Sequence, residues 1–229
     1  GLAGLVYEVL WAKYLALYVG STGLAQVIVL ATYMGGLALG SELLGAAADR
    51  VANPLKLYAF LEMGIGAYAL LFEPIFAAGR DVFLAVVRAS GLTPGGLVAG
   101  KVLACVLSIL LPTFLMGGTL PALARHMMRT MGDVAPRVSR LYFLNSLGAV
   151  GGCLLAGFYL IGHFGLQFSM VVGATLNIAV GVVALAVFAR EREAAAATPA
   201  AAAAEPDELL PGWAYAVVLA AVGLAGAGS

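Results

Sequence analysis

Six long apolar stretches, separated by short polar gaps, occupy almost the whole of this chain. A bilayer core about 30 Å thick is crossed by a helix of roughly 20 apolar residues, which is close to the length of each stretch. With 62% hydrophobic and 10% charged residues, the chain has too few polar side chains to cover a water-soluble domain. The sequence therefore predicts an all-α membrane protein whose main partner is the lipid bilayer.

The polar gaps and composition shifts divide the chain into three parts. The predicted membrane helices cover about residues 1–19, 24–47, 54–72, 97–116, 141–161 and 168–188. Residues 75–90 alternate charged and apolar side chains, which predicts an amphipathic helix lying in the membrane interface. We therefore expect a six-helix transmembrane bundle over 1–190, an Ala/Pro-rich linker over 191–211 and the start of a seventh membrane helix over 212–229.

Lysine and arginine residues are distributed unequally between the two sides that these helices define. One side receives Arg50, Lys56, Arg125, Arg129, Arg137, Arg140, Arg190 and Arg192, and the other receives Arg80, Arg88 and Lys101. Basic residues accumulate in the cytoplasmic loops of membrane proteins. We therefore expect the chain in the inner, cytoplasmic membrane, with its N-terminus and the linker in the cytoplasm.

The sequence has no recognisable catalytic or metal-binding motif. It lacks H-E-x-x-H, G-x-S-x-G and P-loop patterns, and neither its two histidines nor its two cysteines are spaced as ligands. We expect Cys105 and Cys153 to be small core residues. The formal net charge is zero, so no overall field favours nucleic acid. We therefore predict no cofactor, no metal, no nucleic-acid partner and no catalytic residue within these 229 residues.

Three glutamates inside the apolar stretches are the candidate binding residues. A charged side chain at membrane depth costs roughly 2.5–3.5 kcal/mol or more, so it usually faces protein or water. Glu8 lies deepest, near the middle of the first stretch, where it would line a polar cavity or bond to a neighbouring helix. Glu62 and Glu42 are the other two candidates, although both also fit a polar network at the cytoplasmic helix ends.

Small residues at helical spacing predict where helices approach closely. Gly36 and Gly40 lie on one face of the second stretch, and Gly148 and Gly152 lie in the fifth. Asn145, followed by Ala149, Cys153 and Gly157, predicts a close helix contact with one polar bond.

Four segments, in this order, resemble the membrane region of fused major-facilitator/spermidine-synthase proteins. They are YEVLWAKYLALYVGS at 7–21, GLALGSELLGAAADRVANPLKLYAFLEMGIGAYALL at 36–71, LPTFLMGGTLPALAR at 111–125 and RLYFLNSLGAVGGCLLAGFYLIGHFGL at 140–166. The resemblance implies a bundle like one half of a major-facilitator fold. The segment from Gly45 to Arg50 is similar to the loop between the second and third helices of that fold, which implies a gate-like charge network for Asp49 and Arg50. The Gly-Arg pair that usually follows is missing here.

Two functions remain open on these grounds. In the first, the chain is the membrane domain of a spermidine-synthase-like fusion and binds or moves a cationic, polyamine-type substrate through Glu8, Glu62 and Glu42. In the second, it is a non-catalytic structural or accessory subunit that docks with other membrane subunits in a larger complex. The aminopropyltransferase domain of the family is a soluble Rossmann-like fold. Aminopropyl transfer would therefore need such a domain beyond residue 229.

Overall fold

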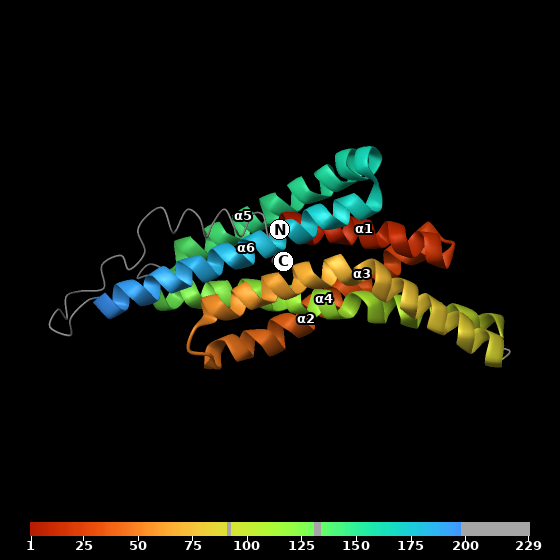
Figure 1. Ribbon diagram of the computed structural model, residues 1–229, viewed down its shortest axis with the longest axis horizontal. Coiled ribbons are helices and arrows are strands. Elements are labelled where there is room, and N and C mark those ends of the chain that lie inside the picture. The colour runs from red at the N-terminus through yellow and green to blue at the C-terminus, as the bar shows by residue number, and fades with distance from the viewer. Residues whose placement is uncertain (91–92, 131–133, 198–229) are drawn as a thin grey trace.

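The computed structural model describes residues 1–90, 93–130 and 134–197, and these residues form an elongated bundle of helices (Figure 1). The helices are α1 (Leu2–Val19), α2 (Thr22–Arg50), α3 (Pro54–Ser90), α4 (Pro94–Thr130), α5 (Val134–Leu154) and α6 (Ile161–Ala197), with a π-helical turn η1 (Leu155–Leu160) between the last two. No strand occurs in the described ranges. The predicted all-α class is therefore confirmed. Most of the predicted linker and the seventh apolar run lie outside the described residues.

Four helical segments of the described chain are long and apolar enough to cross a membrane. They are Leu2–Val19, Thr22–Arg50, Gly95–Arg129 and Val138–Glu193. The last has 56 residues, or about 84 Å of helix, far more than one crossing needs. Gly165 interrupts it with φ 77° and ψ 178°, a conformation open only to glycine, and the chain folds back there (Figure 1). α3 is as long as α4, but charged residues recur along its length, and it is not one of the four segments that are apolar enough to cross a membrane by composition.

Several helices extend beyond their predicted ends. Residues 75–90 form no separate helix, because α3 continues through Pro74 to Ser90. α4 likewise continues through Pro112 and Pro121 to Thr130, so Arg125 and Arg129 lie on a helix and not in a loop. Neighbouring helices can satisfy the carbonyl groups that a proline leaves without a donor. α6 runs to Ala197, so the first residues of the predicted linker are helical, as their alanines favour.

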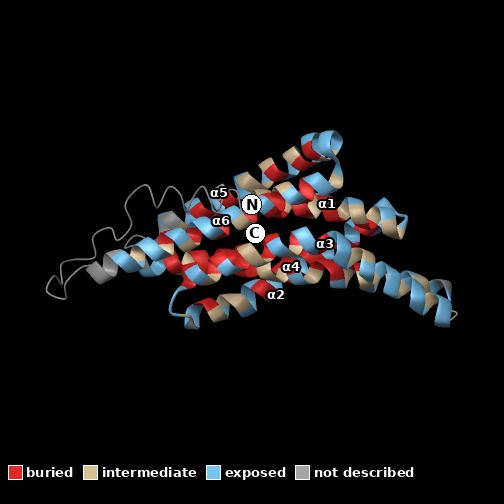
Figure 2. Cartoon of the chain, viewed as in Figure 1, coloured by how far each residue is buried: buried red, intermediate tan, exposed pale blue. Residues whose placement is uncertain are grey.

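The core consists of two apolar clusters that follow one another along the bundle. The first joins α1 and most of α2 to the middle of α3, and the second joins the ends of α2, α4 and α6 to the start of α3. Between the clusters lie four buried polar residues, here called the polar layer: Glu62, Thr119, Asn145 and Asn177, which are 0%, 0%, 2% and 2% exposed. Figure 2 shows the buried residues on the facing sides of the helices, with exposed residues towards the tip of the α3–α4 hairpin.

Glycines set the closest helix contacts. A Cβ atom on Gly36 or Gly40 of α2 would collide with Thr113 or Phe114 of α4, so α2 and α4 approach closely at this face. Gly152 of α5 packs on the backbone of Leu2, and Gly148 is half-buried.

The predicted contact face of α5 is correct only in part. Asn145 and Ala149 contact Gly1, but Cys153 is exposed and a Cβ on Gly157 would meet nothing within 4 Å. Successive steps of four residues rotate by 40° each around a helix of 100° per residue. The face therefore drifts away from α1 after two turns. Cys105 is buried as expected.

Candidate functional site

The polar layer is the one place in the described core where four helices each contribute a buried polar side chain. Glu62 lies on α3 between Ala59 of the second cluster and Ile65 of the first. Asn177 holds the same position on α6, between Ala174 and Val180. Thr119 lies on α4 between Met116 of the first cluster and Ala122 of the second. Asn145 follows Leu141 of the second cluster on α5 and precedes Ala156 of the first cluster in η1.

Glycine contacts place Glu62 and Asn177 at the same level. Gly66 packs against Ala174 and Ile178, and Gly181 packs against Ala59 and Met63. Glu62 lies between the two contact positions on α3, and Asn177 lies between those on α6. Because residues three and four apart share a helix face, both side chains lie on the faces that meet. Gly173, one turn from Asn177, packs against the ring of Tyr7 and so brings α1 to the same place.

Several buried polar groups of this region make no hydrogen bond of ideal geometry, in contrast to the buried Ser and Thr hydroxyls. Neither carboxyl oxygen of Glu62 makes a hydrogen bond of ideal geometry, and neither does Oδ1 of Asn145 or Oδ1 of Asn177, but the Tyr58 hydroxyl lies within reach of the Glu62 carboxyl group as a weak donor. The hydroxyls of Tyr7 and Tyr58 are also buried without a hydrogen bond of ideal geometry. By contrast, Thr119 donates to the Met116 carbonyl at 2.8 Å, as most buried Ser and Thr hydroxyls donate within their own helix.

The carboxyl group of Glu62 interacts electrostatically with the hydroxyl groups of Tyr7 and Tyr58. Tyr58 precedes Glu62 by one helical turn and interacts with its carboxyl group, and Tyr7 interacts with it from α1. Tyr7 stacks on Trp11 with ring centroids 5.6 Å apart, and Trp11 packs on Phe72 of α3 at 5.9 Å. These ring contacts fix the position of the Tyr7 side chain against α3.

A carboxyl group buried at this depth favours a bound proton or cation. Burial removes the water that would otherwise stabilise the negative charge. A cation that reaches Glu62 restores that stabilisation, and an ammonium group also supplies hydrogen-bond donors. Among the described residues no group of three or more His, Cys, Asp and Glu side chains is placed to hold a metal ion.

The other two candidate glutamates lie elsewhere. Glu8 is half-buried and faces α2, where its electrostatic partner is Tyr33. Glu42 is exposed on the surface of α2. The structure therefore does not bring the three glutamates together, and Glu62, not Glu8, is the most buried of them.

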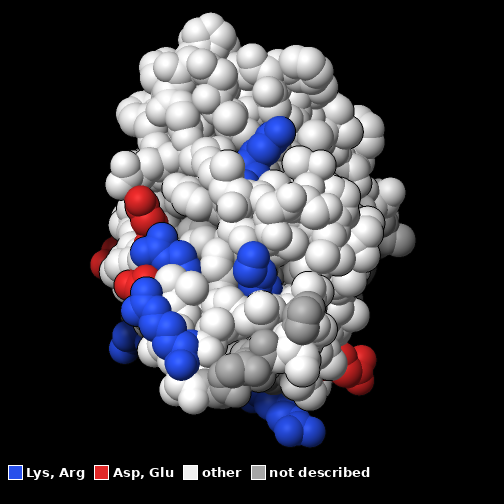
Figure 3. All heavy atoms as spheres, turned by 90° about the vertical axis from the view of Figure 1, so that its right-hand side faces the viewer, with Lys and Arg blue, Asp and Glu red and all other residues white. Residues whose placement is uncertain are grey.

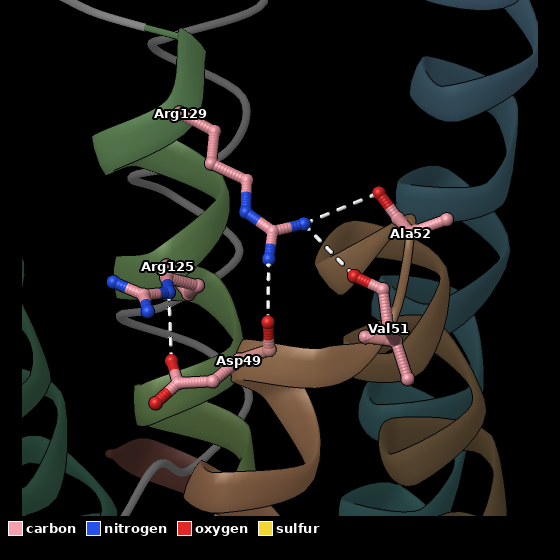
Figure 4. A network of polar contacts seen from close by, with 5 residues as sticks. All are labelled: Asp49, Val51, Ala52, Arg125 and Arg129. Atoms are coloured by element: carbon pink, nitrogen blue, oxygen red, sulfur yellow. Dashed lines mark hydrogen bonds and ion pairs between the residues drawn. The ribbon is translucent and has the colours of Figure 1, made fainter.

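A second polar network closes the end of the bundle where α2, α4 and α6 finish (Figure 4). Arg125 Nε lies 2.7 Å from Asp49 Oδ1, which gives an ion pair between α4 and α2. Arg129 donates from Nη1 to the carbonyls of Val51 and Ala52 at 2.8 and 3.2 Å, and from Nη2 to the Asp49 carbonyl at 2.9 Å. It thereby satisfies carbonyls that the end of α2 leaves free.

The same end is also joined to α6. The buried ring of His126 places Nε2 3.4 Å from Oε1 of Glu191. Asp49 therefore belongs to an ion-paired network at this end of the bundle. Arg50 is exposed and forms no ion pair with a described residue, and Arg125 and Arg129 take the basic positions instead.

The opposite end of the bundle carries fewer charges. Figure 3 looks onto the end where α1 stops and α3 meets α4, and uncharged atoms cover most of it. Arg80 pairs with its neighbour Asp81 at 3.1 Å, and the Lys101 ammonium lies 5.6 Å from the Tyr18 ring centroid. The two predicted groups of basic residues are thus separated along the bundle.

A groove of about 420 Å³ between α3 and α4 lies in this second half of the bundle. It is lined by Ile75, Phe83, Leu103, Leu107 and five further apolar residues, with Ser108 as its one polar residue. Ser108 donates its hydroxyl to the Ala104 carbonyl at 2.7 Å. The groove therefore offers no group for a cation and is not the candidate site.

Comparisons with protein-family models, with curated proteins and with solved structures give no match to this chain. The assignment of a site therefore depends on its geometry. The sequence reasoning named Glu62 and Asn145 but not Tyr7, Tyr58 or Asn177. Two signals were available: Asn177 is an isolated amide in an apolar stretch, and Tyr58 precedes Glu62 by four residues.

Proposed function

We propose that this chain is the membrane domain of a spermidine-synthase-like fusion and that it binds and moves a cationic, polyamine-type solute at Glu62. The observation that carries this proposal is the complete burial of Glu62 among other buried polar side chains, with the neutral Tyr58 hydroxyl beside its carboxyl group. A buried carboxylate is expensive unless a charge of opposite sign is paired with it. An acidic side chain at membrane depth is typical of a pathway for ions or protons.

The proposal includes six membrane crossings with the Asp49–Arg129 end in the cytoplasm. The reversal at Gly165 supports counting the 56-residue segment as two crossings. α3 supplies a further crossing, because it packs between α4 and α6 and so can bury its glutamate inside the bundle. The accumulation of arginines at the ends of α4 and α6 supports the cytoplasmic orientation.

The experiment is uptake of radiolabelled spermidine by proteoliposomes that contain the purified chain. Glu62→Gln keeps the shape of the side chain and removes its charge, so we expect uptake to fall at least about tenfold. Glu42→Gln is the matched control, because Glu42 is exposed, and its uptake should equal that of the unmodified protein. Glu8→Gln should change uptake less than about twofold, since Glu8 faces Tyr33 outside the polar layer.

Two results would overturn the proposal. The first is the absence of spermidine binding and uptake by the unmodified protein. The second is equal uptake by the Glu62→Gln and Glu42→Gln proteins.

A further inference from the structure

Most of the buried polar atoms around Glu62 are hydrogen-bond acceptors. The acceptors are the two carboxyl oxygens of Glu62, Asn145 Oδ1 and Asn177 Oδ1, while Trp11 Nε1, beside Tyr7, is a donor. The Tyr7 and Tyr58 hydroxyls can accept as well as donate. The region therefore has more hydrogen-bond acceptors than donors, and a complementary ligand must bring donors of its own.

We propose that this site recognises a primary ammonium group by hydrogen bonding and discriminates against cations that cannot donate. This inference rests on the proposed function and specifies how the solute is recognised. A primary ammonium has three N–H donors and no acceptor. Glu62 can take one donor, and Asn177 and Tyr58, which flank it from α6 and from the preceding turn of α3, can take the others. A quaternary ammonium of equal charge would leave these oxygens without donors.

The tight backbone contacts around the site support this selectivity. Gly66 and Gly181 hold α3 and α6 together above and below Glu62, and Gly173 holds the Tyr7 ring against α6. Backbone contacts of this kind cannot widen without moving whole helices. A trimethylated nitrogen is larger than an ammonium and gains no hydrogen bond in return. Both size and donor count therefore favour the primary amine.

The test is calorimetric titration of the purified full chain in detergent with 1,4-diaminobutane and with its hexamethylated bis-quaternary analogue. We expect the diamine to bind at least about tenfold more tightly. Tyr58→Phe removes only the hydroxyl and should weaken diamine binding several-fold without changing the binding of the quaternary analogue. Asn177→Leu should weaken diamine binding about tenfold in the same selective way.

Two control variants test whether the effect is local. Tyr33→Phe also removes a buried, unpartnered hydroxyl, but one that lies beside Glu8. Thr113→Val removes a buried hydroxyl outside the polar layer that already donates to the Ile109 carbonyl at 2.8 Å. Both variants should bind the diamine as the unmodified protein does. The elution volume on size exclusion checks that each variant is folded, and Tyr58→Phe serves if Asn177→Leu fails that check.

The outcomes separate this inference from the proposed function. Equal affinity for the diamine and the quaternary analogue would overturn the hydrogen-bond selectivity while leaving a cation site at Glu62. If sodium chloride displaced the diamine more strongly than choline chloride at the same concentration, the hydrogen-bond selectivity would also be overturned, because the site would then bind an inorganic cation. If neither the diamine nor its quaternary analogue bound, the proposed function itself would be overturned.

Discussion

The closest contact between two helices, at Gly40, yields a stability prediction whose size follows from the structure. An ideal Cβ on Gly40 would lie 2.8 Å from the carbonyl carbon of Phe114 and 3.1 Å from Cα of Gly117, and closer still to the Phe114 carbonyl oxygen. Non-bonded carbon atoms prefer about 3.5–4.0 Å. Gly40→Ala must therefore move α2 from α4 by roughly 1 Å, because the obstructing atoms belong to the backbone and cannot rotate away.

Overpacking of this kind costs about 1–3 kcal/mol, and we expect a value near 3 because neither helix can yield locally. For a chain of this size that corresponds to a Tm lower by about 6–12 °C. The assay is thermal unfolding of the purified protein in detergent, followed by size-exclusion fluorescence. Gly35→Ala is the matched control on the same helix, since a Cβ there meets nothing within 4 Å. The reasoning is wrong if the two variants have the same Tm.

Three further predictions concern the turn, the helix end and the topology. Gly165→Ala should destabilise the protein by about 2 kcal/mol, because an alanine is strained in the backbone conformation of Gly165. Gly162→Ala should not destabilise it, because Gly162 lies in a helix with open space around it. Thermal unfolding compares the two variants, and equal stabilities would contradict the prediction. Arg129→Gln should cost about 1 kcal/mol and speed amide hydrogen exchange at the end of α2, and unchanged exchange there would count against the capping role. With the native cysteines replaced, Ala89→Cys should react with a membrane-impermeant maleimide on intact cells and Ala52→Cys only after lysis, and the reverse pattern would refute the proposed orientation.

The existence of the helices could be predicted from the sequence, but several of their ends could not. Apolar stretches of bilayer length identify membrane helices because no other spanning structure satisfies their backbone. Proline is a less reliable signal in such a protein. Pro74, Pro112 and Pro121 all lie inside continuous helices. The alternation of charged and apolar side chains over 75–90 predicts a separate interfacial helix, although these residues continue α3.

The candidate site was only partly predictable, because position along a helix gives depth but not the direction a side chain faces. Glu8 lies near the middle of its stretch, yet it points to α2 and is half-buried. Glu62 lies nearer a helix end, yet it is fully buried. The close contacts at Gly66 of α3 and Gly181 of α6 bring α6 onto its face. Asn177 is brought to Glu62 by those same contacts, which join residues more than a hundred positions apart and leave no local trace in the sequence.

The division of the apolar core into two clusters has a mechanical consequence. No described buried residue belongs to both clusters, and the side chains that separate them are polar and poorly bonded. Close-packed apolar clusters move as rigid blocks, so bending concentrates where they are interrupted. We therefore expect α3 and α6 to bend most easily at the level of Glu62, between the contacts at Gly66 and Gly181 that hold the two helices together.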